Sequence, residues 1–108
     1  MVLDTMLASP QYISMKATKL FHSKDKYGRG LIEIVIWKTP KPVTPSDHFY
    51  KYSLVYIVDG VRVVGYDNEK GKGDHKHLYG QEENYEFIST QQLVADFMGD
   101  VKEVNKHE

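Results

Sequence analysis

The sequence contains no cysteine, which excludes a disulfide framework and any cysteine-ligated zinc site. The same absence fits a reducing compartment, so we expect a cytoplasmic protein. No apolar run approaches the roughly 20 residues that a membrane-spanning helix requires, so no membrane partner is expected. A net charge of -1 gives no overall field that indicates nucleic acid, although the 14 Lys and Arg residues can still form a local basic patch.

What the chain does contain is typical of one globular domain. Its 108 residues are 41% hydrophobic and 27% charged, which are ordinary values for a soluble protein with a single core. Residues 1–14 are weakly patterned, and Met15 would serve equally well as a translation start. These features predict an N-terminal extension over residues 1–14 and a single domain over residues 15–108.

The first half of the chain carries strand patterns. Residues 16–23 alternate loosely, and residues 31–38 form a β-branched, almost wholly apolar run that predicts a central strand. Residues 39–47 contain three prolines, which cannot donate ladder hydrogen bonds, and therefore predict an extended loop. The length of this loop suggests that the strands on either side of it need not be neighbours.

A hairpin that turns at Asp59 and Gly60 is the strongest turn prediction. Residues 49–58 before it alternate cleanly, and a two-residue Asp-Gly connection favours a type I′ turn. Regular pairing from that turn places Tyr52 opposite Asp67, on the same face of the sheet.

The C-terminal part predicts short strands and then a helix. Residues 74–79 and 85–88 are expected to be strands, with residues 80–84 as a polar loop between them. Ser89 and Gln92 form a capping box, and an apolar stripe at helical spacing follows. We therefore predict an α+β fold, in which a mostly antiparallel sheet of about five to six strands is packed by one C-terminal helix.

The stretch richest in titratable groups begins at Tyr66 and ends at His77. It contains three acids, three lysines and two histidines. If its last part is extended, His75 and His77 project from one face, while Asp74 and Lys76 project from the other. Histidine exchanges protons near neutral pH, so general acid–base catalysis by His75 and His77 is the favoured hypothesis.

Other residues complete this hypothetical site. The candidates that orient the histidines are Asp67, Asn68 and Asp74. Three lysines are candidates for binding phosphate: Lys70, Lys72 and Lys76. Two aromatic residues are candidates for contact with the substrate: Tyr52, because of its predicted register, and Trp37, which could stack on a base.

Alternative interpretations of the same residues stay open. Two histidines at i and i+2 on a strand can converge on one divalent metal, with a third ligand from Asp67, His22 or His48. Two histidines alone do not define a metal site, so no cofactor is predicted from their spacing. The segment is also compatible with a solvated strand edge that has no function. Tyr52 and Trp37 are likewise compatible with a role in core packing.

In the order of its motifs, the sequence resembles the TumE-like toxins of type II toxin–antitoxin modules. The residues that carry the resemblance are Trp37, the proline-rich loop, Tyr50-x-Tyr52, Tyr56-Ile57-Val58-Asp59-Gly60, Tyr66-Asp67-Asn68, Gly71-Lys72-Gly73-Asp74-His75-Lys76-His77 and Tyr85-x-Phe87. The resemblance covers residues 15–101, and the segment around the histidines is its most specific part. The family pattern often has arginine where Lys76 stands, a change that keeps the positive charge.

The resemblance implies a toxin whose partner is a protein antitoxin, usually a helix-turn-helix protein. Together with the histidines and lysines, it leads us to expect action on RNA, as a ribonuclease or as an inhibitor of translation. Two alternatives come from other classes: a non-catalytic module that binds nucleic acid or protein, and a metal-dependent hydrolase that uses the histidine pair. A homodimer is compatible with the sequence.

Overall fold

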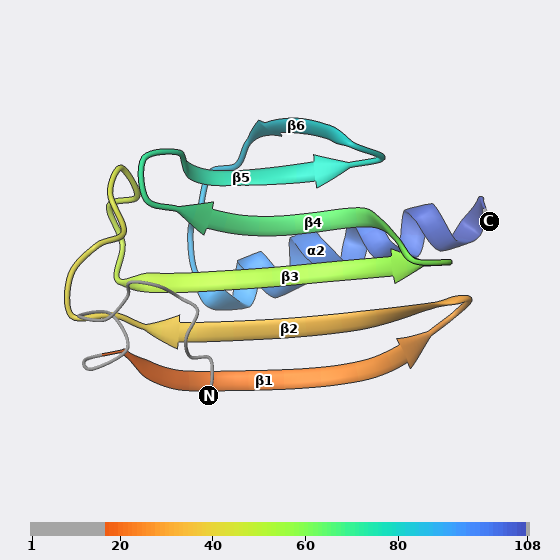
Figure 1. The fold of residues 1–108 in the computed structure, drawn as a ribbon, viewed down its shortest axis with the longest axis horizontal. Helices are drawn as coiled ribbons and strands as arrows, with labels where there is room; N and C mark the ends of the chain where they lie inside the picture. Colours follow the sequence, from red (N-terminus) through yellow and green to blue (C-terminus); the bar gives the residue numbers. More distant parts are fainter. Residues whose placement is uncertain (1–16, 108) are drawn as a thin grey trace.

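The computed structural model describes residues 17–107, which form one antiparallel sheet followed by one helix (Figure 1). The strands are β1 (Thr18–Tyr27), β2 (Gly30–Lys38), β3 (Tyr50–Val58), β4 (Val61–Glu69), β5 (Gly73–Leu78) and β6 (Gln81–Asn84), and the helix is α2 (Thr90–Lys106). The predicted α+β fold is confirmed. The predicted extension over residues 1–14 lies outside the described residues.

Every strand pairs with the next one in sequence, so the order across the sheet is β1-β2-β3-β4-β5-β6. The strands on either side of the proline-rich loop, which its length allowed to lie apart, are direct neighbours, because β2 pairs with β3. The Thr39 N–H donates to the Phe49 carbonyl at 2.9 Å, which closes the loop at its base. The loop also contacts the β4–β5 turn, where the Gly71 N–H donates to the Thr44 carbonyl at 2.8 Å.

Two strand assignments differ from the sequence prediction. β1 continues to Tyr27 through a run of charged residues, because an edge strand exposes most of its side chains to water. β6 occupies part of the predicted polar loop, while residues 85–88, predicted as a strand, connect β6 to the helix. Tyr79 and Gly80 have φ of 51° and 81° and form the tight turn before β6. All four β6 side chains are exposed, so this strand does not need the apolar pattern of an internal one.

The β3–β4 hairpin turns at Asp59 and Gly60 as predicted. Both residues have positive φ, 52° and 79°, as a type I′ turn requires. Pairing is regular as far as Ile57. The preceding residue of β3, Tyr56, then pairs with Val64, so the register shifts by one residue at this point.

The shift makes Val63 the extra residue of a β-bulge, and the side chains of Val63 and Val64 are both buried. Beyond the bulge, Asp67 pairs with Ser53, and the predicted placement of Tyr52 opposite Asp67 is wrong. A one-residue shift also exchanges the two faces of a sheet. Asp67 therefore points away from the helix.

Helix α2 packs across one face of the sheet, behind β3 and β4 in the view of Figure 1. Ser89 caps its first turn by accepting a hydrogen bond from the Gln92 N–H at 3.0 Å. The buried residues of the helix are Leu93, Phe97, Val101 and Val104. We call the side of the sheet that carries Tyr52, Leu54 and Tyr56 the helix face, and the opposite side the distal face. Between residues 17 and 107, no helix is long and apolar enough to cross a membrane.

Replacing glycine by alanine at two uncrowded positions should have opposite effects on stability. Apart from chain neighbours and, for Gly99, the backbone of its own helix, a Cβ atom at Gly60 or at Gly99 would meet no atom of the described residues within 4 Å. Gly60→Ala puts alanine at a φ of 79° and should lower the free energy of unfolding by about 1 kcal/mol. Gly99→Ala stiffens a helical position and should raise the free energy of unfolding by up to about 1 kcal/mol. Denaturant unfolding measures both changes, and effects of the same sign would contradict the backbone explanation.

Candidate functional site

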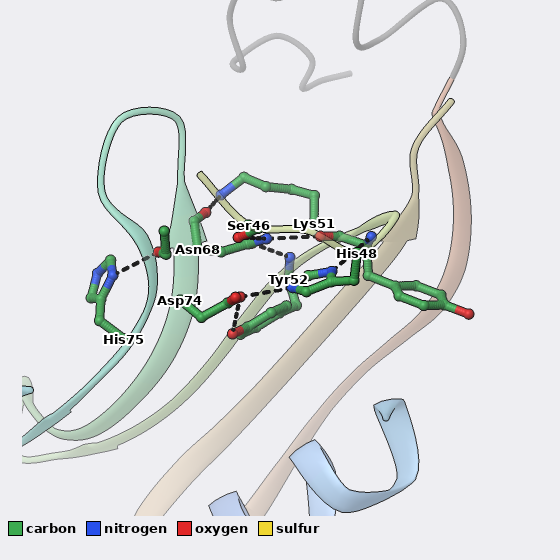
Figure 2. A network of polar contacts seen from close by, with 9 residues as sticks. Ser46, His48, Lys51, Tyr52, Asn68, Asp74 and His75 are labelled. Atoms are coloured by element: carbon green, nitrogen blue, oxygen red, sulfur yellow. Dashed lines mark hydrogen bonds and ion pairs between the residues drawn. The ribbon is translucent and has the colours of Figure 1, made fainter. Parts of the chain in front are cut away.

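Strands β4 and β5 divide the polar segment between the two faces of the sheet. They pair antiparallel, with Asp67 opposite His75 and Asn68 opposite Asp74. Side chains alternate along a strand, so Asn68 and Asp74 lie on the helix face and Asp67 and His75 on the distal face. Figure 2 shows the His75 and Asp74 side chains pointing in opposite directions from β5. The segment therefore builds two separate clusters.

On the helix face, Asp74 is bonded to side chains from β3 and from the proline-rich loop. Its Oδ1 accepts hydrogen bonds from the Tyr52 hydroxyl at 2.7 Å and from His48 Nε2 at 2.8 Å (Figure 2). His48 Nδ1 accepts from the Tyr50 N–H at 3.1 Å, so the proton of a neutral His48 ring lies on Nε2. Burial and the bond to Asp74 raise the pKa of Tyr52, which keeps its hydroxyl a donor. Phe87 stacks on the His48 ring with centroids 3.8 Å apart.

This helix-face cluster is a structural network. In the His48 ring, Nε2 donates to an acceptor and Nδ1 accepts from a donor, and the carboxylate of Asp74 accepts two hydrogen bonds. The network ties the proline-rich loop and the connection to α2 onto the sheet. Asp74 and Tyr52, both predicted as site residues, thus lie together but apart from His75.

Asn68 is fully buried and completes the β3–β4 pairing with its side chain. Its Oδ1 accepts from the Tyr52 N–H at 3.0 Å, and its Nδ2 donates to the Tyr50 carbonyl at 2.7 Å (Figure 2). These two backbone groups lie just beyond Ser53, where the paired part of β3 and β4 ends. The amide therefore replaces strand hydrogen bonds that the backbone of β4 does not supply.

Lys76 is bonded to carboxylates on the helix face. Its Nζ lies 3.4 Å from Asp100 Oδ2 and 3.6 Å from Glu83 Oε2. The Tyr66 hydroxyl donates to the same Asp100 oxygen, and burial together with this bond raises the pKa of Tyr66. Lys76 thus ties β5 to α2 and lies on the other face from the two histidines.

The distal face holds the second group, which we call the distal cluster: Asp67, His75, His77 and Glu82. A carboxylate oxygen of Asp67 and one ring nitrogen of each histidine all lie within 4.8 Å of one another. His75 Nε2 is 2.6 Å from Asp67 Oδ1 and 3.5 Å from Glu82 Oε2. The two histidine rings meet edge to face, with centroids 5.0 Å apart.

Not every polar atom of the distal cluster has a hydrogen-bond partner among the described residues. His75 is buried, and its Nδ1 lies 3.0 Å from the Gly73 carbonyl, which can only accept, so Nδ1 carries a proton. Asp67 Oδ1 is close to Nε2, but it lies off the line of a hydrogen bond. This buried oxygen receives no hydrogen bond from any residue between 17 and 107. A buried polar atom without a partner is costly, by about 1–3 kcal/mol, and calls for a functional or structural explanation.

Cations border the distal cluster. Lys72 Nζ is 3.0 Å from Glu82 Oε2, and this bond lowers the pKa of Glu82 and raises the pKa of Lys72. Burial lowers the pKa of His77, and the nearby charge of Arg62 adds to the effect against the opposing charge of Asp67. Glu82 is therefore a carboxylate, and His77 a neutral ring, at neutral pH.

Comparison with protein families decides the affiliation of this chain. A family model described as toxin TumE matches residues 4–105. This chain belongs to the TumE toxin family. The matched region begins within residues 1–14, earlier than the residues that carry the sequence resemblance, and the extension stays a prediction. Neither the curated proteins nor the solved structures give a significant match.

Glu82 of this TumE-family chain belongs to the distal cluster, although the sequence did not lead us to predict it there. It pairs with His77 because β5 and β6 are joined by a two-residue turn at Tyr79 and Gly80. A residue followed by glycine between two short extended runs is the same signal that marks the turn before β4. Reading it in that way would have placed Glu82 beside His77.

Arg62 and Lys51 are two further residues without an earlier prediction. Arg62 crosses Gly65, where a Cβ atom would stand 2.9 Å from Arg62 Cδ, so the missing side chain makes room for the arginine. Lys51 donates to a carbonyl of β4, and burial lowers the pKa of its amine. Both depend on contacts between strands, for which the sequence carries no local signal.

The two remaining predicted residues have different positions. Trp37 lies on the distal face of β2, opposite Lys51 of β3, and Lys19 Nζ stands 5.2 Å from its ring centroid. Lys70 is exposed in the β4–β5 turn, next to Lys72. The distal face therefore collects Trp37 and the histidines, with Lys72 at its edge.

Asn68→Ala should be strongly destabilising. It removes the partners of two backbone groups, and each unsatisfied buried group costs about 1–3 kcal/mol, so we expect a loss of roughly 2–6 kcal/mol. Ser46→Ala is the control, because it removes only a 3.4 Å contact to the same amide and should cost less than about 1 kcal/mol. Urea unfolding of both variants tests this. Similar small losses would show that Asn68 does not hold β3 to β4.

Proposed function

We propose that this TumE-family protein acts on RNA through the distal cluster and that a protein antitoxin neutralises it. Family membership indicates the toxin role. The target and the site are supported by one observation: histidines, carboxylates and cations meet on the face of the sheet away from α2.

Cleavage of a phosphodiester in RNA needs three kinds of group. One takes the proton of the attacking hydroxyl, one stabilises the leaving oxygen, and cations balance the charge of the phosphate. The distal cluster supplies the first two kinds. Lys72 and Arg62 stand beside Glu82 and His77 and are placed to supply the third.

The distal face also offers a surface for a single strand. Trp37 and Lys51 are direct neighbours across β2 and β3. Aromatic side chains on sheets stack with bases, while lysine and arginine contact phosphates. An RNA strand that crosses from β2 to β5 would pass Trp37 and Lys51 before it reaches the distal cluster. A helix-turn-helix antitoxin that covers this face would then compete with RNA.

His77→Ala should abolish both growth inhibition and loss of RNA, because it removes a partly buried histidine of the distal cluster. His22→Ala is the matched control, since His22 lies on β1 and its Nε2 is 3.0 Å from Glu33. Growth after induced expression, and degradation of RNA by the purified variants, measure the effect. A His77→Ala variant as active as the wild type would rule out the distal cluster as the site.

The same RNA assay separates an enzyme from a binding module. A ribonuclease destroys many RNA molecules per protein molecule, so product should accumulate well beyond the protein concentration. Inhibition that saturates at one protein per target, with RNA intact, would contradict cleavage and support binding alone.

Lys72→Gln should weaken binding of single-stranded RNA and make it less sensitive to salt. The slope of log affinity against log salt should fall by about 1, because one phosphate contact is lost. Lys102→Gln, on the exposed side of α2, should leave the slope unchanged. Filter binding between low and moderate salt measures both. Equal changes in the two variants would show that RNA does not run along the distal face.

A further inference from the structure

We propose that the distal cluster binds one divalent first-row transition-metal ion, such as Zn²⁺, through Asp67, His75 and His77, with Glu82 beside the fourth position. This inference rests on the proposed function in that it names the cofactor of the same site. Binding of the ion itself can be measured without RNA.

His75 has the arrangement of a metal ligand. Its Nδ1–H donates to the Gly73 carbonyl at 3.0 Å, which leaves the lone pair of a neutral ring on Nε2. Metal-ligating histidines commonly donate their other ring N–H to a backbone carbonyl or carboxylate, and this contact fixes the tautomer and orients the ring. Here Nε2 lies near two carboxylates, those of Asp67 and Glu82, at 2.6 and 3.5 Å.

Asp67 provides the second, independent observation. Its Oδ1 is buried and accepts no hydrogen bond from the described residues, although His75 Nε2 is only 2.6 Å away. The oxygen lies off the direction in which His75 Nε2 would form a hydrogen bond. A metal ion does not need that alignment and would satisfy the oxygen directly.

The distances suit one ion after small movements. Ligand bonds of about 2.0–2.2 Å in a tetrahedral site place donor atoms about 3.4 Å apart. The three donor atoms of Asp67, His75 and His77 now lie within 4.8 Å of one another, with the shortest separation 2.6 Å. Shifts on the order of 1 Å are therefore sufficient. Asp67 and His77 are only partly buried, which leaves their side chains room to move.

The donor set indicates the kind of ion. Two imidazoles and one carboxylate suit Zn²⁺ and its first-row neighbours, whereas Mg²⁺ and Ca²⁺ prefer oxygen ligands alone. Such an ion, when bound, supplies a water molecule activated at neutral pH. His75 and His77 then hold the ion, which replaces the acid and base roles expected for them from the sequence. Glu82, bonded to Lys72, stays at the edge of the site.

Calorimetric titration of chelator-treated protein with ZnCl₂ tests the site. The wild type should bind one ion, and His77→Ala should bind at least about tenfold more weakly, because a ligand has been lost. His22→Ala should bind like the wild type, and MgCl₂ should not displace Zn²⁺. No binding, or equal binding by the wild type and His77→Ala, would overturn the proposal.

Thermal unfolding gives a second readout, with Asp67→Asn as a variant that keeps the shape of the side chain. Excess Zn²⁺ should raise the Tm of the wild type but not that of Asp67→Asn, because ligands stabilise only the state that binds them. An equal rise in both would indicate adventitious binding and contradict the site.

RNA assays in chelator distinguish this inference from the proposed function. Activity lost in chelator and restored by Zn²⁺ supports both. RNA loss that persists in chelator, with His77→Ala inactive, supports the function and contradicts the ion as its cofactor. Zn²⁺ binding that depends on His77, without any effect on RNA, supports the ion site and contradicts the function.

Discussion

The β-bulge at Val63 is the constraint on which the arrangement of the site depends. Strict pairing from the hairpin turn would point Asp67 toward the helix. One extra residue reverses the alternation in the rest of β4, so that Tyr66 enters the core and Asp67 points away from it. His75 pairs with Asp67 and follows it onto the distal face. A single inserted residue thereby separates the polar chemistry of the segment from the packing of the core.

The two clusters made by the segment differ in how completely their polar atoms are paired. On the helix face, Asp74 receives donors from Tyr52 and His48. On the distal face, Asp67 Oδ1 is buried without a donor among residues 17–107, next to a histidine whose other nitrogen is already bonded. A buried polar atom in a folded protein usually has a hydrogen-bond partner, because an unpaired one lowers the stability of the fold. Its retention beside cations and a second histidine is what distinguishes the distal cluster from the helix-face cluster.

The helix-face cluster supports the distal cluster through the proline-rich loop. That loop is held by the bonds of His48, and its Pro45 lies against Gly73, where a Cβ atom would meet Pro45 Cγ at 3.2 Å. Gly73 has a φ of 80°, and its carbonyl accepts the Nδ1 proton of His75. The orientation of the His75 ring therefore depends on a loop that joins β2 to β3, far from it in sequence.

The sequence alone determined the features that depend on neighbouring residues. These are the apolar strands, the Asp59-Gly60 turn, the Ser89 cap, and the projection of His75 and His77 from one face. Only the tertiary structure decided whether the histidines lie on the helix face or on the distal face. The β-bulge that decides this depends on how β3 and β4 pair, and the alternation of residues within a single strand does not reveal it. β6 also escaped prediction, since an exposed edge strand needs no apolar pattern. The partners of the histidines, above all Glu82, were fixed by strand order, which is a property of contacts distant in sequence.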